Sequence, residues 1–148
     1  MKNLYLYIGF VLIFIVLNSC SSSNAVVSQS SNLSKYKYVV FGNEPTGDRE
    51  LDDVVMIIEN EIANKFKVVS VQKCLKLLNL GESIISPSIN VKSEKWDGGH
   101  TYITINFHDY ETNQSIAVVK SSGIGLTVSH DQKIALKAIR KKLNKILK

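Results

Sequence analysis

Hydrophobic positions recur with helical spacing in two parts of the chain. Between Asp48 and Phe66 the apolar residues follow one another at intervals of three and four, which predicts an amphipathic helix. Acidic residues crowd its first turn, where the helix dipole favours negative charge. A second helical pattern closes the chain, and Ser129 and Gln132 are spaced as a capping box at its start. Its apolar face holds Leu136, Ile139, Leu143, Ile146 and Leu147.

Alternating polar and apolar residues predict the strands. Thr101 to Phe107 alternates most clearly, and with residues 115–121 it predicts a β-hairpin. Shorter strands are expected at 36–41, 67–71 and 89–92, a short helix at 72–80 ended by Gly81, and an irregular segment at 83–88 around Pro87. The pattern therefore predicts one small α+β or α/β domain. We expect a mixed or antiparallel sheet of about four strands packed by two main helices, as a β-α-β unit, a β-hairpin and a C-terminal helix.

The first twenty residues have the composition of an export signal. Lys2 precedes an apolar run of 14 residues, 4–17, which is short for a membrane span of about 20 residues. Leu17-Asn18-Ser19-Cys20 follows, and this stretch resembles the lipobox of bacterial lipoproteins. The resemblance implies removal of residues 1–19 and attachment of lipid to Cys20. An uncleaved anchor helix and a secretory signal cut at the same place without lipid are the alternatives.

The predicted lipoprotein has two parts. Residues 20–34 are uncharged and rich in serine, which is typical of a flexible tether, and residues 35–148 have the length of a single domain. Ser21 is not the Asp that favours the inner membrane in enteric lipoproteins. No acidic run follows Cys20 to direct the protein to the cell surface. The resemblance therefore implies an outer-membrane lipoprotein whose domain faces the periplasm.

The net charge of the chain is +5, and its basic part is the C-terminal helix. Seven basic residues stand against one acidic residue from Asp131 to Lys148. The exposed face is expected to hold Lys133, Lys137, Arg140, Lys141 and Lys145. It predicts either a surface for an anionic partner, such as lipid headgroups, cell-wall polymer or an acidic protein, or the solvated outer face of a packed helix. We expect no nucleic-acid partner for an exported protein.

No residue pattern predicts catalysis, a cofactor or a metal ion. His100 and His108 lie eight residues apart on one expected strand, about 26 Å at about 3.3 Å per residue, which is too far to share a metal. Residues 123–125 lack the third glycine and the lysine of phosphate-binding loops. Cys74 stands among apolar residues, where a buried thiol behaves as a small hydrophobe. We therefore expect a protein that is not an enzyme.

The order of elements carries a second resemblance. A helix ends at Phe66-Lys67-Val68-Val69, a hairpin spans 105–119, and a basic helix closes the chain. This order is similar to that of small α/β envelope lipoproteins, including domains related to curli-secretion and penicillin-binding-protein-activating lipoproteins. The resemblance implies a non-enzymatic accessory or scaffold protein that binds another envelope component. The alternative is a periplasmic module for a small molecule or cell-wall fragment, with Trp96, Asp97 and His100 in a lid.

Overall fold

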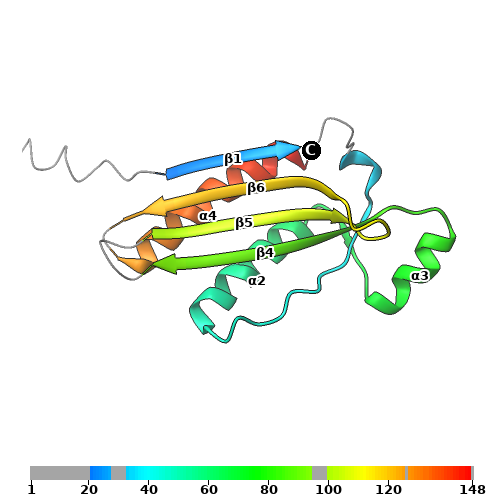
Figure 1. The fold of residues 1–148 in the computed structure, drawn as a ribbon, viewed down its shortest axis with the longest axis horizontal. Helices are drawn as coiled ribbons and strands as arrows, with labels where there is room; N and C mark the ends of the chain where they lie inside the picture. Colours follow the sequence, from blue (N-terminus) through cyan, green and yellow to red (C-terminus); the bar gives the residue numbers. More distant parts are fainter. Residues whose placement is uncertain (1–20, 28–32, 95–99, 126, 148) are drawn as a thin grey trace, which may run out of the picture.

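The computed structural model describes residues 21–27, 33–94, 100–125 and 127–147, which form a two-layer α+β domain (Figure 1). The strands are β1 (Ser21–Val27), β2 (Tyr38–Val39), β3 (Lys67–Val68), β4 (Ile84–Glu94), β5 (His100–Asp109) and β6 (Ser115–Ile124). The helices are the 3-10 turn η1 (Leu33–Lys35), α2 (Arg49–Ala63), α3 (Val71–Asn79) and α4 (Val128–Ile146). One mixed sheet has the strand order β1-β6-β5-β4-β2-β3.

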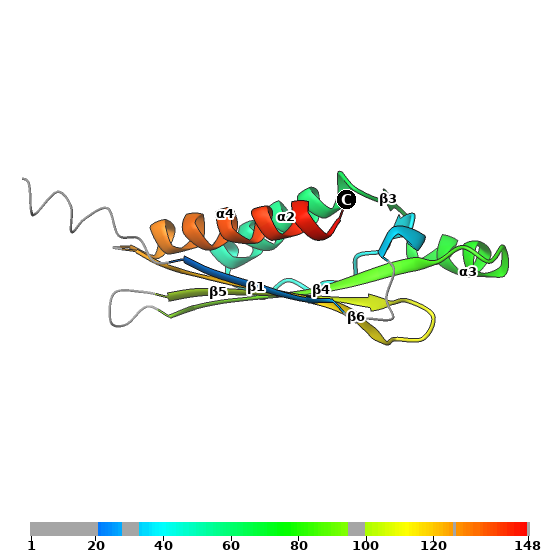
Figure 2. The same ribbon diagram turned by 90° about the horizontal axis from the view of Figure 1, so that it is seen from above.

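Helices α2 and α4 lie side by side on one face of the sheet (Figure 2). Their apolar stripes pack with the inward-facing residues of β4, β5 and β6, and these residues form the main core. Its fully buried members include Ile58 and Ile62 of α2, Ile139 of α4, and Ile103, Ile105 and Phe107 of β5. Among the described residues, no helix is both long and apolar enough to cross a membrane.

Helix α2 follows the predicted pattern closely. Asp48 is its N-cap, and the Asp48 carboxylate accepts a hydrogen bond from the backbone N–H of Glu50 at 3.0 Å. This contact satisfies one of the unpaired donors in the first turn of the helix. Strands β2 and β3, which flank α2 in the chain, pair in parallel. The predicted β-α-β unit is therefore confirmed, although each strand has two residues.

Strands β4, β5 and β6 form an antiparallel meander. Ile103, Ile105 and Phe107 share one buried face of β5, as the alternation predicted. Helix α4 packs directly on β6, where Ser121 donates a hydrogen bond to the backbone carbonyl of Ala135 at 3.0 Å. A Cβ atom placed on Gly123 would lie 2.3 Å from the backbone oxygen of Asp131, so only glycine permits this close approach.

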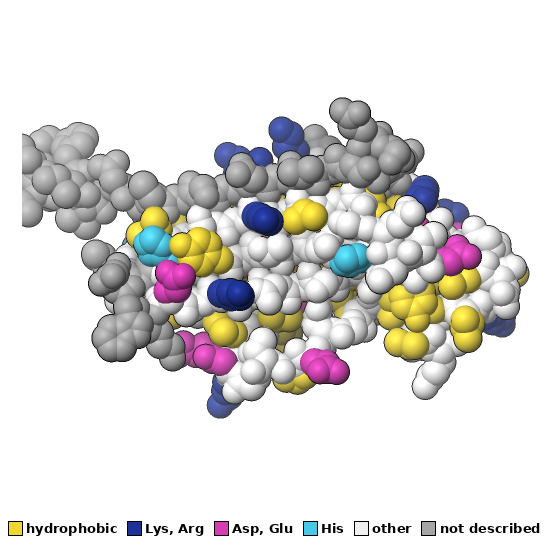
Figure 3. All heavy atoms as spheres, in the orientation of Figure 1, with side chains coloured by type: hydrophobic (Ala, Val, Ile, Leu, Met, Phe, Trp, Pro, Cys, Tyr) yellow, Lys and Arg dark blue, Asp and Glu magenta, His cyan; other side chains and the backbone are white. Residues whose placement is uncertain are grey.

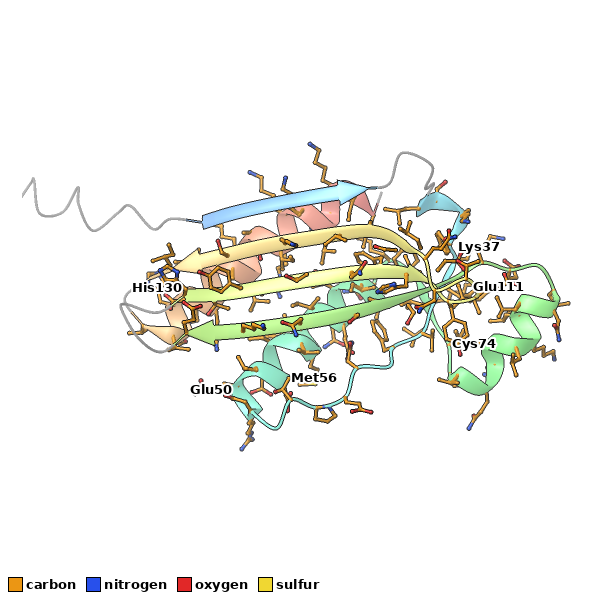
Figure 4. The ribbon with its side chains drawn as sticks, viewed as in Figure 1. Lys37, Glu50, Met56, Cys74, Glu111 and His130 are labelled. Atoms are coloured by element: carbon orange, nitrogen blue, oxygen red, sulfur yellow. The ribbon has the colours of Figure 1, made fainter. Side chains whose placement is uncertain are left out.

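Helix α3 also matches its prediction. Gly81 follows it with a φ of +76°, and its N–H donates to the carbonyl of Leu78 at 2.9 Å, as in a left-handed C-terminal cap. Cys74 is fully buried with Val40 and Ile84 in a second small cluster, where burial raises the pKa of the thiol (Figure 4). The expectation of a buried cysteine is therefore confirmed.

Three expectations about the elements are wrong. Seven residues of the expected tether, Ser21–Val27, form strand β1, which pairs with β6 through backbone hydrogen bonds. The expected irregular segment 83–88 belongs mostly to β4, in which Pro87 pairs with Phe107. The capping box is also wrong, because α4 begins earlier and Thr127 is its N-cap, accepting from the N–H of His130 at 3.2 Å. With β1 included, the sheet has six strands, more than the expected number of about four.

Candidate functional site

The face of the sheet opposite the helices is a polar surface, which we call the open face. Side chains alternate along β4, β5 and β6, so the residues next to the buried ones point to this side. At its centre Asn90, Thr104 and Lys120 stand in one row across the three strands. Figure 3 shows this surface as mainly polar, with lysines near its middle. The open face comprises Ser88, Asn90, Lys92, Tyr102, Thr104, Asn106 and Lys120.

Apolar groups border the open face at one end. Tyr102 is 40% exposed and Ile124 is 39% exposed, and they lie on neighbouring strands. The Tyr102 hydroxyl is 2.9 Å from Nδ1 of His100, which begins β5. Trp96 and Asp97, which were expected to form a lid with His100, lie outside the described residues.

Helix α4 carries the predicted basic residues on its exposed side. Ala135, Ile139 and Leu143 of the same helix are buried against the sheet. The sequence therefore predicted this helix face correctly, and the exposed residues are Lys133, Lys137, Arg140, Lys141 and Lys145. Arg140 has a partner within the chain, because its Nε lies 2.8 Å from Oε1 of Glu61 on α2.

An acidic groove lies along the other helix, between α2 and the loop that precedes it. Its volume is about 210 Å³, and it is lined by Asn43, Glu44, Pro45, Asp52, Val55, Met56 and Glu59. Asp52 accepts hydrogen bonds from the N–H of Thr46 at 2.7 Å and from its hydroxyl at 2.8 Å, and these bonds lower the pKa of Asp52. Asn43 donates to Glu59 at 2.8 Å. The groove is therefore built by contacts between the loop and the helix.

Sequence reasoning missed the acidic groove. The acidic residues at the start of α2 were explained by the helix dipole alone. The spacing of Asp52, Met56 and Glu59 at intervals of four and three was the available signal, because these residues lie on one side of a helix. The loop residues could not be added from spacing, since only the folded structure brings Glu44 and Pro45 against α2.

Tyr36 and Asp109 form a polar contact at the opposite end of the sheet from residues 100 and 124. The Tyr36 hydroxyl donates to the Asp109 carboxylate at 2.7 Å, and Lys35 Nζ lies 3.9 Å from the same oxygen. Asp109 also accepts from the backbone N–H groups of Glu111 and Thr112, at 3.1 and 3.0 Å. The acidic residue of the hairpin turn therefore stabilises the turn, as Asp residues commonly do.

Asp131 is a buried polar residue whose side chain accepts no hydrogen bond from the described part of the chain. It lies in the first turn of α4 and is fully buried, and neither of its carboxylate oxygens has a partner among the described residues. The positive end of the helix dipole favours a negative charge there and offsets part of the cost of burial. Within the described part of the chain, no group of three His, Cys, Asp or Glu residues is placed to hold a metal ion.

Comparisons with known proteins relate the chain to others through its fold alone. No family model matches it, and no curated protein matches it. Two structures of the PelC dodecamer from Paraburkholderia phytofirmans, one of them a single-residue variant, are each 11% identical to it. The match to the variant covers 86% of this chain and 99% of the PelC chain, with a TM-score of 0.52. The match to the other structure covers 86% of this chain and 98% of the PelC chain, with a TM-score of 0.51. A PDZ domain protein from Parabacteroides distasonis is 10% identical with a TM-score of 0.53, covering 90% of this chain but 38% of its own.

Proposed function

We propose that this chain is a non-enzymatic scaffold lipoprotein of the bacterial envelope. In this proposal lipid on Cys20 holds it at the outer membrane, with its domain on the periplasmic side. Its role is to bind another envelope component. The lipobox supports the anchor, and the open face supports the binding role.

The observation that carries the binding role is the long open face, which the described helices leave exposed (Figure 2). Three strands of ten or eleven residues present it, and no described helix lies over it. Asn90, Thr104 and Lys120 offer hydrogen-bond donors and acceptors across its centre. Tyr102 and Ile124 supply partly exposed apolar groups at one end, and aromatic residues of this kind contribute strongly to binding. A protein partner can therefore find both polar and apolar contacts on one surface.

The basic residues of α4 are a second surface in the proposal. They lie on the opposite side of the molecule from the open face, so both surfaces can be occupied at once. Lysine-rich surfaces attract anionic partners over about 10 Å at moderate salt. A scaffold needs at least two such surfaces in order to hold one component near another.

Site-specific photo-crosslinking in the intact envelope tests the binding role. A photoreactive residue replaces Asn90 at the centre of the open face, and a matched variant carries it at Asn60, which is exposed on α2. We expect a discrete adduct from position 90 that is absent at position 60. No adduct at position 90, or the same adducts at both positions, would count against the proposal.

A further inference from the structure

The two outer edges of the helical layer carry opposite charges. Arg140 faces α2, since it pairs with Glu61 at 2.8 Å. Because a helix turns by about 100° per residue, Lys142 and Lys145 lie on the side of α4 away from α2, and Lys141 lies beside them. We call these three lysines the basic edge. Helix α4 contacts β1 and β6, so the basic edge lies over the β1 side of the sheet.

The acidic groove occupies the other outer edge. Glu61 faces α4, and Glu59, two residues earlier, therefore lies on the far side of α2. Glu44, Asp52 and Glu59 line the groove around Met56, whose side chain is 54% exposed (Figure 4). This surface offers carboxylates and an exposed apolar group. An ideal occupant has cations beside aliphatic chains, as a row of lysines does.

The two outer edges of the sheet, like the two edges of the helical layer, are complementary to each other. Strand β1 forms one edge, and β4 is the outermost strand on the other side once it has passed β2. The N–H of Ile89 donates to Asn43 at 3.1 Å, away from β5. Because alternate backbone groups of a strand point to the same side, the N–H and C=O groups of Val91 and Ser93 also point outward. Three antiparallel pairings separate β1 from β4, so the two edges run antiparallel to each other.

We infer that copies of this chain associate head to tail, with the basic edge of one copy in the acidic groove of the next. Strand β1 of the first copy then lies beside the outer end of β4 of the second, in the antiparallel direction that sheets favour. The helices alternate as α4, α2, α4, α2 along the assembly, and lysine–carboxylate pairs between copies repeat the Arg140–Glu61 pairing within each copy. The pairing of the two edges does not depend on the proposed function, and only the argument that all copies share one membrane rests on the proposed lipid anchor.

Two features favour a second copy over other occupants. The carboxylates of the groove repel anionic lipids and anionic polymers, and they attract the lysines that the same chain carries on its opposite edge. Successive copies related by rotation about an axis along the strands also keep the start of every β1 at the same end. Cys20 precedes β1 directly, so all copies can be anchored to one membrane. Such a contact joins different surfaces and therefore continues into a ring or a filament.

Covalent crosslinking tests the arrangement. Met56→Cys and Lys145→Cys are combined in the full-length chain, which is purified from membranes in detergent and treated with a short bis-maleimide. The unchanged chain and each single variant are treated in parallel. We expect a ladder of dimers, trimers and larger species from the double variant, because each copy carries a cysteine at both edges, and only dimers from a mixture of the single variants. Monomer alone, or dimers from each single variant by itself, would overturn the inference.

Charge reversal provides a second test that does not require new cysteines. Glu44→Lys at the rim of the groove is expected to lower the association constant between copies by about threefold to tenfold. Sedimentation velocity measures this constant. Adding Lys145→Glu to the same chain is expected to restore it. Glu111→Lys, an equal change of charge in the β5–β6 turn, serves as the control (Figure 4). An equal response to Glu44→Lys and Glu111→Lys would contradict the inference. Binding of anionic vesicles through Lys145 by a chain that stays monomeric would also contradict it.

Discussion

The hydrogen bond between Tyr36 and Asp109 joins parts of the chain that are 73 residues apart. Burial and the bond to Asp109 raise the pKa of Tyr36, so its hydroxyl remains a donor at any physiological pH. Burial alone would raise the pKa of Asp109. The hydrogen bonds from Tyr36, Thr112 and Glu111 outweigh that effect and lower it. The contact therefore stabilises the fold while Asp109 is ionised.

Replacing Tyr36 with Phe should make the free energy of unfolding less dependent on pH in the acidic range. Because the pKa of folded Asp109 lies below the unfolded value of about 3.9, its stabilisation is complete above that value and is lost as the pH falls through the folded pKa. Tyr36→Phe is expected to lower the free energy of unfolding by about 1–2 kcal/mol at pH 7, and by much less near pH 2. Urea unfolding at both pH values measures this free energy. Tyr102→Phe, on the exposed face, should change the free energy of unfolding by less than about 0.5 kcal/mol. Equal losses at both pH values would contradict the prediction.

Replacing Asp131 is predicted to increase the stability of the domain, in contrast to replacing Tyr36. Burial of a carboxylate without hydrogen bonds destabilises the folded state, and the helix dipole offsets only about 0.3–1 kcal/mol of this destabilisation. Asp131→Asn removes the charge with little change of shape, so we expect the free energy of unfolding to rise by about 1 kcal/mol. Thermal and urea unfolding measure the change, with Asp53→Asn on the exposed side of α2 as the control. A loss of stability in Asp131→Asn would show that the carboxylate makes a favourable interaction.

At the scale of elements, the close contact between α4 and β6 depends on one glycine. A Cβ on Gly123 would lie 2.3 Å from Asp131 O and 2.6 Å from Ala135 N, and both are backbone atoms that cannot turn aside. We expect Gly123→Ala to destabilise the domain by about 1–3 kcal/mol, since α4 must move off the sheet. Gly42→Ala meets no atom within 4 Å and should be nearly neutral. Urea midpoints measure both variants, and similar midpoints would contradict the predicted contact.

Local pattern predicted the elements whose own residues determine them. Helix α2, strand β5 and helix α4 each carry a strong period, and each was found near its expected place. Strand β1 was missed because its serine-rich sequence has little preference for strands, and it is held by pairing with β6 about 95 residues away. The start of β4 was missed because of Pro87. The nitrogen of Pro87, which carries no hydrogen, faces the outer side of β4 beyond the contact with β2, where no described strand pairs with β4.

The same distinction explains the candidate surfaces. The basic residues of α4 lie on one helix, so spacing alone placed them on one face. The open face could be foreseen for β5 from its alternation, but its extent depends on the register of three strands. The acidic groove depends on how the preceding loop folds against α2, and its position opposite the basic edge depends on how α2 and α4 pack together. That packing is a property of the whole fold and is invisible in the sequence of either helix.

At the scale of the whole molecule, β1 determines how a lipid on Cys20 would hold the domain. Ser21 pairs with Gly123, so the anchor would be joined to the end of the sheet where β6 leads into α4. That end also presents Tyr102 and Ile124, the apolar part of the surface. With strand β1 beginning one residue after the cysteine, the domain would stand close to the membrane, with its strands leading away from it.

Replacing Cys20 tests this anchoring directly. Cys20→Ser is expected to move the protein from the membrane fraction to the soluble periplasmic fraction, because acyl chains contribute about 0.8 kcal/mol per buried methylene and the variant cannot carry them. Cys74→Ala removes the other cysteine, which is buried in the domain, and should leave the protein in the membrane fraction. Fractionation and the intact mass of the purified chain measure both effects. An unmodified mass at the N-terminus, or Cys20→Ser protein that remains in the membrane fraction, would show that another segment holds the domain there. The α+β fold would be unaffected by either result, since the described residues begin after Cys20.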